Sequence, residues 1–433
     1  MKDSPSIAAP IWWLVLSIVL AGSMAYYVAE IWSANQPGQF SDLYAPWWGA
    51  HEILLNGRNT YSPEVAHEIQ AVIYGAPVTS NSTDDPSNIA GGFAYPPYMA
   101  FLLWPTLHLS FSAAEKVLWL ASVLLTLLSV ALWLRALRFR LPPLAWLTIA
   151  FFALGSFPTL QGLQLLNLSL IASALIAICL FLLSTDQLVL AGILLAASTF
   201  KPQLTVGLIP WLALWSMGDW RRRRSMVWSF LTSMFVLVAI SEWLVPNWIS
   251  SFLRVVRAYR HYTYGHSLLD VWFTPVWGLG VATCVLIAVL AISWRYRSLG
   301  ADSPLFLVVT SLVLAATLVV IPTLAPHLQL PLLPGILCLL RGRTLLSSSG
   351  ALSQLVLAGT WSLLAWPWIA ACGLTLAAME FPAHKLLRFW EVPLYTSPVL
   401  PLAVLVGLSC LLFATTPTGG QRFRRPDPSL ARP

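Results

Sequence analysis

Residues 117–134, VLWLASVLLTLLSVALWL, form a run of apolar and small polar side chains without a single charge. A second uncharged run, LFLVVTSLVLAATLVVI, occupies residues 305–321. A helix needs about 20 such residues to cross the ~30 Å hydrocarbon layer of a membrane, whereas a barrel strand needs about 10 residues of alternating polarity. Because a helix also satisfies its own backbone hydrogen bonds in lipid, these runs predict a bundle of membrane-spanning α-helices.

The composition of the whole chain agrees with this class. Of the 433 residues, 58% are hydrophobic and only 9% are charged, against roughly 25% charged residues in soluble domains. The formal net charge is +7, but the arginines lie mostly between apolar runs, a distribution that reports membrane topology and not nucleic-acid binding. The five cysteines lack CxxC spacing, so neither a zinc site nor a disulfide framework is indicated. We expect one integral membrane domain over residues 1–433.

The apolar segments predict about twelve crossings. They are residues 11–33, 97–134, 142–157, 163–183, 187–200, 202–217, 225–245, 272–294, 304–322, 327–340, 351–370 and 398–414. With the N-terminus inside, this count places five arginine clusters in the cytoplasm, as the bias of Lys and Arg toward cytoplasmic loops requires. They are Arg135, Arg138 and Arg140; Arg221 to Arg224; Arg295 and Arg297; Arg341 and Arg343; and Arg422, Arg424 and Arg425. Residues 97–109 contain Pro105 and precede a polar break, so we expect them to form a half-length or re-entrant helix.

The same topology predicts where the polar segments lie. Both termini, including a tail over residues 415–433, are expected to be cytoplasmic. The expected external segments are residues 34–96, 246–270, 323–326 and 371–397. The first of them is expected to contain short helices at Leu43–Leu55 and Glu64–Tyr74 and then a flexible loop at Thr79–Gly92, where Ser, Asn, Asp and Gly are frequent.

Asp42 is the candidate catalytic residue. It follows the first apolar segment within the run FSDLY, in the expected external loop. A carboxylate held just outside a bilayer is well placed to take a proton from a sugar or lipid hydroxyl. The alternative is a purely structural role, because Asp often caps the N-terminus of a helix such as the one expected from residue 43.

Cationic side chains form the second group of candidates. Lys201 interrupts a long apolar stretch, where a lysine costs about 2.5–3.5 kcal/mol at the centre of a membrane helix unless it is paired or faces water. We consider two roles for it: contact with a phosphate, or simple snorkelling to the interface. Arg254, Arg257 and Arg260 recur every three residues in the second external segment. They are suited either to a ligand phosphate or to anionic lipid headgroups.

Aromatic residues surround the expected pocket, where their faces could stack on a sugar ring: Trp47, Trp48, Tyr61, Tyr95 and Tyr98. The alternative is that they belong to the aromatic belts at the membrane interfaces. No GxGxxG, Walker, HExxH or nucleophile-elbow motif is present, which disfavours a nucleotide-sugar donor and indicates no cofactor. No metal ligand is assigned, because the only external acidic pair, Asp84-Asp85, lies in the expected flexible loop.

Several motifs together resemble those of glycosyltransferase family 87. They are, in chain order, Asp42 with the aromatic residues after it, Asn56-Gly57 followed by Tyr61, Phe93-Ala94-Tyr95-Pro96-Pro97, Gly162-Leu163-Gln164 with Asn167, Phe200-Lys201-Pro202, Gly265-His266-Ser267-Leu268, and Pro326-His327. The extra Leu163 departs from the family's glycine-glutamine element and leaves Gln161 or Gln164 as its match. The similarity extends over about residues 38–340.

The resemblance implies a GT-C fold and a polyprenol-phosphate-dependent transferase, with mannose as the expected sugar. It implies that Asp42 is the base, and that Tyr44, Trp48, Tyr95, Gln164, Asn167, Lys201, Arg254, Arg257, Arg260, His266, Ser267 and His327 bind substrates. The expected partners are a polyprenyl-phosphate sugar donor, a lipid or glycan acceptor and membrane lipids, with no nucleic acid. Two alternatives are a transporter or flippase of lipid-linked sugars, and a family member that binds lipid glycan without turning it over.

Overall fold

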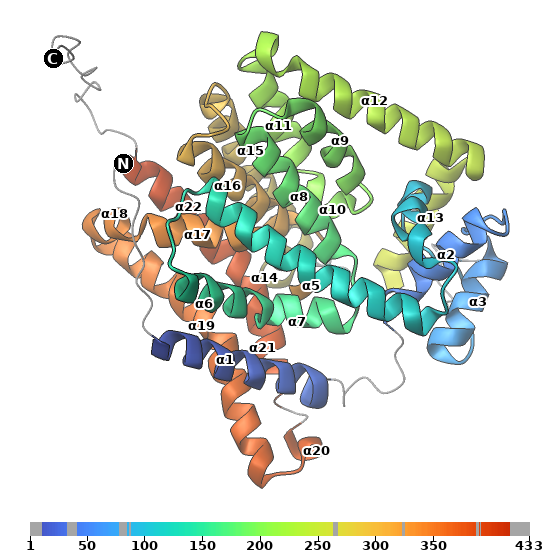
Figure 1. Cartoon of the computed structure of the whole chain (residues 1–433), viewed down its shortest axis with the longest axis horizontal. Helices are drawn as coiled ribbons and strands as arrows, with labels where there is room; N and C mark the ends of the chain where they lie inside the picture. The colour runs from blue at the N-terminus through green and yellow to red at the C-terminus, as the bar shows by residue number, and fades with distance from the viewer. Residues whose placement is uncertain are drawn as a thin grey trace.

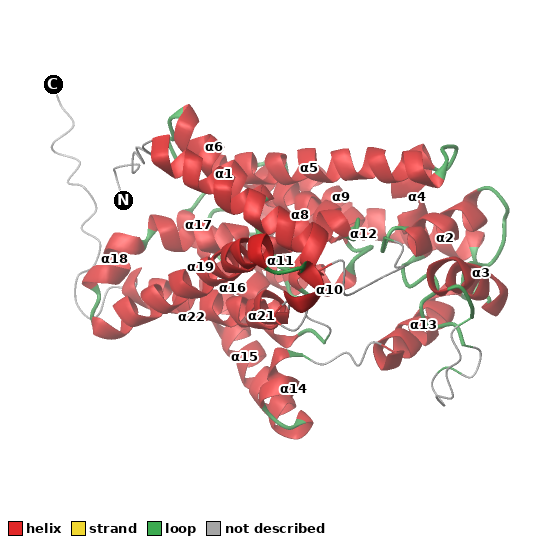
Figure 2. Ribbon diagram, turned by 90° about the horizontal axis from the view of Figure 1, so that it is seen from below, coloured by secondary structure: helices red, strands yellow, loops and turns green. Residues whose placement is uncertain are grey.

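The computed structural model describes residues 11–32, 41–77, 85, 88–262, 267–322, 325–386, 389 and 391–415. Every regular element in these residues is helical (Figures 1 and 2), which confirms the all-α class. The first half of the chain comprises α1 (Ile11–Tyr26), η1 (Tyr27–Trp32), α2 (Tyr44–Leu54), α3 (Pro63–Tyr74), η3 (Pro97–Met99), α4 (Ala100–Leu103), η4 (Trp104–Thr106), α5 (Phe111–Ala136), α6 (Pro143–Leu154), α7 (Phe157–Gln164), α8 (Ser169–Ser184), α9 (Leu188–Ser198), α10 (Pro202–Thr205) and α11 (Leu208–Met217).

The second half is built in the same way. It comprises α12 (Trp220–Leu244), α13 (Trp248–Tyr262), α14 (Leu268–Trp272), α15 (Pro275–Tyr296), α16 (Pro304–Val320), η5 (Pro326–Leu328), η6 (Leu330–Leu332), α17 (Leu333–Arg341), α18 (Arg343–Ser348), α19 (Ala351–Glu380), α20 (Ala383–Leu386), α21 (Glu391–Thr396), η8 (Ser397–Val399) and α22 (Leu400–Thr415). In both views α2, α3 and α13 gather at one end of the molecule and α18 lies at the other.

Six helices in the described residues are long and apolar enough to cross a membrane, and the number is seven if α6 and α7, bent by 57°, form one broken span. The predicted number of twelve is not confirmed by this criterion. Large apolar side chains are also exposed on helix surfaces. Phe235 and Trp243 of α12, for example, are 73% and 81% exposed. Soluble proteins rarely expose such patches, and the chain is a multi-pass membrane protein.

Shorter helices also run between the two ends of the bundle. Helix α8 has only 16 residues, about 24 Å at 1.5 Å per residue. It begins at Ser169, whose hydroxyl donates to the carbonyl of His327. Just beyond its other end, Asp186 pairs with Arg222. Short helices of this kind occur in membranes where protein, not lipid, surrounds their ends.

Arginines from three of the five clusters lie close to one another. Arg223 is buried, and its guanidinium donates to the carbonyls of Trp215, Arg297 and Leu299, at 2.5–2.8 Å. Arg138 pairs with Asp302 at 3.6 Å. Clusters that are far apart in the sequence therefore lie on one side of the bundle, as the predicted topology requires.

The two short helices expected in the first loop are confirmed as α2 and α3, within one residue of the predicted bounds. Their external location stays a prediction. Residues 97–109 form the three short turns η3, α4 and η4 and do not make a continuous span. Helix α5 starts afresh at Phe111, where the Ser110 hydroxyl accepts a hydrogen bond from the Ala113 N–H. Of the expected flexible loop, residues 79–84, 86 and 87 lie outside the described residues.

One predicted boundary is wrong. A span was expected over residues 163–183, but the chain breaks between α7 and α8, where Leu166 has a left-handed backbone with φ +49°. Helix α19 continues to Glu380 and so enters the expected external segment 371–397, whose location stays a prediction. Residues 371–380 include Ala, Leu and Met, and these strong helix formers extend the helix past the expected span.

Helices α9 and α12 pack closely at Gly192. A Cβ at this position would lie 2.4 Å from the carbonyl oxygen of Met226 and 2.1 Å from the Ser229 hydroxyl. We expect Gly192→Ala to force the two helices apart, which costs about 1–3 kcal/mol as in other overpacked sites. The measurement is the thermal unfolding midpoint in detergent. Gly280→Ala in α15, where a Cβ would meet nothing within 4 Å, is the matched control, and equal midpoints for the two variants would contradict the close packing.

Candidate active site

Asp42 joins the loop before α2 to the loop after α7. Its backbone N–H donates to the carbonyl of Leu165 at 2.7 Å, and its Oδ2 accepts from Asn167 Nδ2 at 2.7 Å. The N-cap position of α2 falls on Leu43, and this cap has no side-chain hydrogen bond. The capping interpretation of Asp42 is therefore wrong, and the carboxylate is held by a residue 125 positions away in the sequence.

Asn167 owes its position to a strained turn. The left-handed conformation of Leu166 costs about 1–3 kcal/mol for a residue with a side chain, and such strain gathers at functional sites. After this turn the Asn167 N–H donates to the carbonyl of Gly162 at 2.9 Å, and its Oδ1 accepts from the Ser169 N–H at 3.0 Å. The amide is thus fixed with its Nδ2 toward Asp42 and its Oδ1 toward α8.

Lys201 lies on the other side of the same amide. It is 3% exposed, in the break between α9 and α10. Its Nζ donates to Asn167 Oδ1 and, at 3.5 Å, to the hydroxyl of Tyr95. The Nζ also lies 5.6 Å from the centre of the Tyr95 ring, within the range of a cation–π contact. The snorkelling interpretation is therefore wrong, because the ammonium is held inside the protein.

Asp42, Asn167, Lys201 and Tyr95 thus form one polar cluster. The side chain of Asp42 is accessible to water, yet protein surrounds it densely on its other sides. This partial desolvation raises the pKa of the Asp42 carboxyl, and the Asn167 hydrogen bond and the Lys201 ammonium oppose the increase. A carboxylate with a raised pKa that still meets water is a stronger base than an ordinary surface aspartate.

His327 packs against this cluster through its backbone. Its N–H donates to Gln161 Oε1 at 3.0 Å, and its carbonyl accepts from the Ser169 hydroxyl at 2.8 Å. The ring atom Nδ1 is buried and has no hydrogen-bond partner among the described residues. Buried polar atoms rarely stay unsatisfied in proteins, so this nitrogen is a candidate contact for a bound substrate.

Tyr44 and Trp48 pack within the first loop. The buried Tyr44 ring meets the Phe111 ring edge-on at 5.0 Å and lies parallel to Trp48 at 6.3 Å. The indole Nε1 of Trp48 donates to Glu68 at 3.1 Å. These contacts stabilise α2 against α3 and α5. Gln164 is half-buried and lines a surface hollow beside this cluster.

The second group of cations lies on α13. Arg254 and Arg257 are both exposed on one face of this helix, whose first residue, Trp248, meets Tyr98 edge-on at 6.3 Å. The side chain of Arg260 and all of His266 lie outside the described residues. Ser267 caps α14 through a reciprocal pair of hydrogen bonds with Asp270, at 3.1 and 3.0 Å.

Sequence reasoning missed three residues that support the cluster. Gln161 was left open as a match to the family's glutamine but was not included among the site residues, and this side chain holds the His327 backbone. Ser169 looked like an ordinary helix residue, although Asn-x-Ser before an apolar run is a recognisable capping signal. Glu115, a lone acid at the start of an apolar helix, accepts from the Ser41 hydroxyl at 2.7 Å.

Within the acidic pair Asp84-Asp85, Asp85 has a structural role. Asp85 is buried, and its two oxygens accept from the N–H groups of Ile89 and Ala90 at 2.7 and 2.9 Å. Asp84 lies outside the described residues. The Asp85 carboxylate thus shapes the turn that leads into Tyr95.

These features define an all-helical, multi-pass membrane protein whose polar cluster lies at one end of the bundle. The model of glycosyltransferase family 87 matches residues 93–322. Because this match covers more than half of the chain, the protein belongs to glycosyltransferase family 87, and the resemblance is confirmed. Tyr95, Asn167 and Lys201 lie inside the matched range, whereas Asp42 and His327 lie outside it.

The crystal structure of ArnT from Cupriavidus metallidurans bound to undecaprenyl phosphate shares 15% sequence identity with this chain, and the similarity covers 94% of this chain and 77% of that one, with a TM-score of 0.40. No curated protein matches the chain.

We expect Lys201→Met to raise the pKa of Asp42 further, because the ammonium is one of the two groups that favour the charged carboxylate. The measurement is the infrared carbonyl band of the protonated carboxyl across a pH series, assigned by its loss in Asp42→Asn. Lys116→Met, which removes an exposed lysine of α5, is the control. A band that titrates at the same pH with and without Lys201 would show that the two groups are not coupled.

Proposed function

We propose that this family 87 protein transfers a hexose from a polyprenyl-phosphate donor to a hydroxyl group of a lipid or glycan acceptor. The observation that carries the proposal is the Asp42–Asn167–Lys201 arrangement, in which a base and a cation flank one amide at the end of a membrane bundle. Mannose is the proposed sugar, on the motif resemblance alone.

Asp42 acts as the general base. It takes the proton of the acceptor hydroxyl while that oxygen attacks the anomeric carbon, and the bond from this carbon to the phosphate oxygen breaks. The products are the glycosylated acceptor, a polyprenyl phosphate and a protonated Asp42 that returns its proton to water. A single displacement of this kind inverts the anomeric configuration. One carboxylate suffices, because a phosphate leaves without the protonation that a glycosidase acid supplies.

Lys201 stabilises the leaving phosphate. An ammonium has three donors, and two of them are used in the described structure, on Asn167 and Tyr95. The third is free for a phosphate oxygen. Because Lys201 is buried, its charge acts at low effective dielectric, where preorganised donors contribute most to transition-state stabilisation.

His327 and the cations of α13 complete the donor site. The unpaired Nδ1 of His327 offers one hydrogen bond near the phosphate. Arg254 and Arg257 are exposed, so they attract the charged headgroup through the field they create and not through the reacting atoms.

The end of the bundle that carries Asp42 faces the outside of the cell, and both termini are cytoplasmic. The support for this orientation is the arginine network at the opposite end, formed by Arg138, Arg222 and Arg223 with their partners. Cytoplasmic ends of membrane helices collect Lys and Arg.

Asp42→Asn tests the base directly. The variant keeps the size of the side chain and a hydrogen-bonding oxygen for Asn167, so we expect it to fold and to bind donor. Turnover should fall by about 10²- to 10⁴-fold, the usual contribution of general-base catalysis. The measurement is the release of polyprenyl phosphate from labelled polyprenyl-phosphate hexose, with octyl hexosides as acceptors.

Glu68→Gln is the matched control for this test. Glu68 is a partly exposed carboxylate of the same loop that pairs with Arg58 at 2.7 Å. We expect its neutralisation to leave turnover near the wild-type value. Asp42→Asn with wild-type turnover would refute the role of Asp42. Movement of the intact donor across a vesicle membrane, without release of polyprenyl phosphate, would indicate a flippase instead.

The pH dependence gives an independent prediction. Base catalysis needs the carboxylate form, so the rate should rise with pH through the pKa of Asp42. Burial raises this pKa above the ordinary aspartate value of about 3.9, so the acid limb of the pH–rate profile should lie above that pH. The Asn167 hydrogen bond lowers this pKa, so Asn167→Ala should move the limb to higher pH. A pH–rate profile of kcat/KM for both proteins measures the limb. Identical profiles would contradict the proposed coupling.

A further inference from the structure

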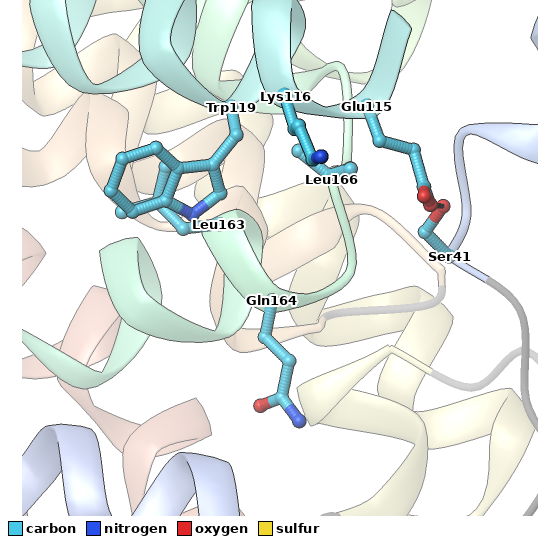
Figure 3. A pocket seen from close by; sticks show the side chains of 7 residues that line it. All are labelled: Ser41, Glu115, Lys116, Trp119, Leu163, Gln164 and Leu166. Carbon is cyan, nitrogen blue, oxygen red and sulfur yellow. Dashed lines mark hydrogen bonds between the residues drawn. The ribbon is translucent and has the colours of Figure 1, made fainter. Parts of the chain in front are cut away.

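A shallow hollow lies beside the segment that carries Asp42 (Figure 3). Its volume is about 390 Å³, and it is lined by Ser41, Glu115, Lys116, Trp119 and Gln164, with two leucines. This volume falls within the range of about 300–1,000 Å³ that is usual for small-molecule sites.

The hollow and the polar cluster lie next to each other along the chain. The Ser41 hydroxyl donates to Glu115 of α5, and the next residue, Asp42, donates its N–H to Leu165. Leu166, which lines the hollow, directly precedes Asn167. Asp42 is therefore one residue along the sequence from Ser41, which lines the hollow. Its partner Asn167 is one residue along the sequence from Leu166, which also lines the hollow.

The lining has the chemistry of a saccharide site. Trp119 is 47% exposed, so its indole face can cover the apolar C–H face of a sugar ring. Glu115 and Lys116 offer a carboxylate and an ammonium, which together can accept from and donate to sugar hydroxyls. In Figure 3 the Glu115, Lys116 and Trp119 side chains project from α5, and Gln164 extends from α7.

We infer that this hollow binds the acceptor as a saccharide, with its ring against Trp119 and its reacting hydroxyl directed to Asp42. The inference rests on the proposed function and names the substrate class for the second half of the reaction. The donor phosphate is bound on the Lys201 side.

Photolabelling tests the site without any need for turnover. The probe is an octyl hexoside with a diazirine on the sugar, and mass spectrometry locates the labelled residues in the purified full-length protein. We expect labels within residues 111–121 and 159–168 that excess unlabelled octyl hexoside removes. Asp42→Asn should keep them, since it changes catalysis and not the hollow. Labels that lie elsewhere, or that excess hexoside does not remove, would overturn the inference.

Steady-state kinetics separate an acceptor site from the other roles of these residues. Trp119→Ala should raise the KM for the octyl hexoside by about tenfold, as the loss of one aromatic contact allows, and leave the KM for the donor unchanged. Trp119→Phe should restore most of the affinity. Trp104→Ala removes another exposed tryptophan, 45% exposed in η4, and should change neither constant.

Glu115→Gln distinguishes binding from positioning. Glutamine keeps an oxygen that can accept from Ser41, so Asp42 stays in place, but the variant loses the charge that holds sugar hydroxyls. We expect a higher acceptor KM with little change in kcat. A change in kcat alone, or in donor KM, would overturn the acceptor assignment. If wild-type protein labels in the hollow but releases no polyprenyl phosphate, the proposed function fails and the saccharide site stands.

Discussion

The rest of the site depends on one amide. Asn167 donates to the Asp42 carboxylate and accepts from the Lys201 ammonium, so a single side chain sets the separation of two opposite charges. A direct ion pair would neutralise both groups and leave neither available to a substrate. With an amide between them, each charge is stabilised and still has unused hydrogen-bonding capacity. This arrangement suits a reaction in which a proton leaves on one side and negative charge develops on the other.

The bundle makes this arrangement by breaking its helices. The residues of the cluster lie in the turn between α7 and α8, the break between α9 and α10, and the loops that precede α2 and η3. Backbone outside regular helix is tolerated at membrane depth only when protein surrounds it or when it lines a cavity. Helices that are shorter than a full span therefore have a function here, because their ends deliver polar side chains to one place.

The class of the fold could be predicted from sequence because it depends on local properties. Uncharged runs such as residues 117–134 and the composition determine an α-helical membrane bundle. The motifs around Tyr95, Asn167 and Lys201 were sufficient to find the family. The break between α7 and α8 and the end of α19 could not be predicted, since one depends on the backbone of Leu166 and the other on how far a helix continues past the expected span. The partner of Asp42 was equally hidden, because no local signal joins residues 42 and 167. The sequence also could not decide between Gln161 and Gln164, because these residues differ only in the direction they face around a short helix.

The central claim is that Asp42 and Lys201 act on opposite sides of one anomeric carbon. The most direct measurement is a structure of the Asp42→Asn protein, at a resolution that shows phosphate, with an intact polyprenyl-phosphate hexose bound. We predict that a phosphate oxygen lies within hydrogen-bonding distance of Lys201 Nζ. We also predict that the residue 42 side chain faces the anomeric carbon from the side opposite the phosphate. A phosphate bound away from Lys201, or a sugar whose anomeric carbon faces away from residue 42, would contradict the claim.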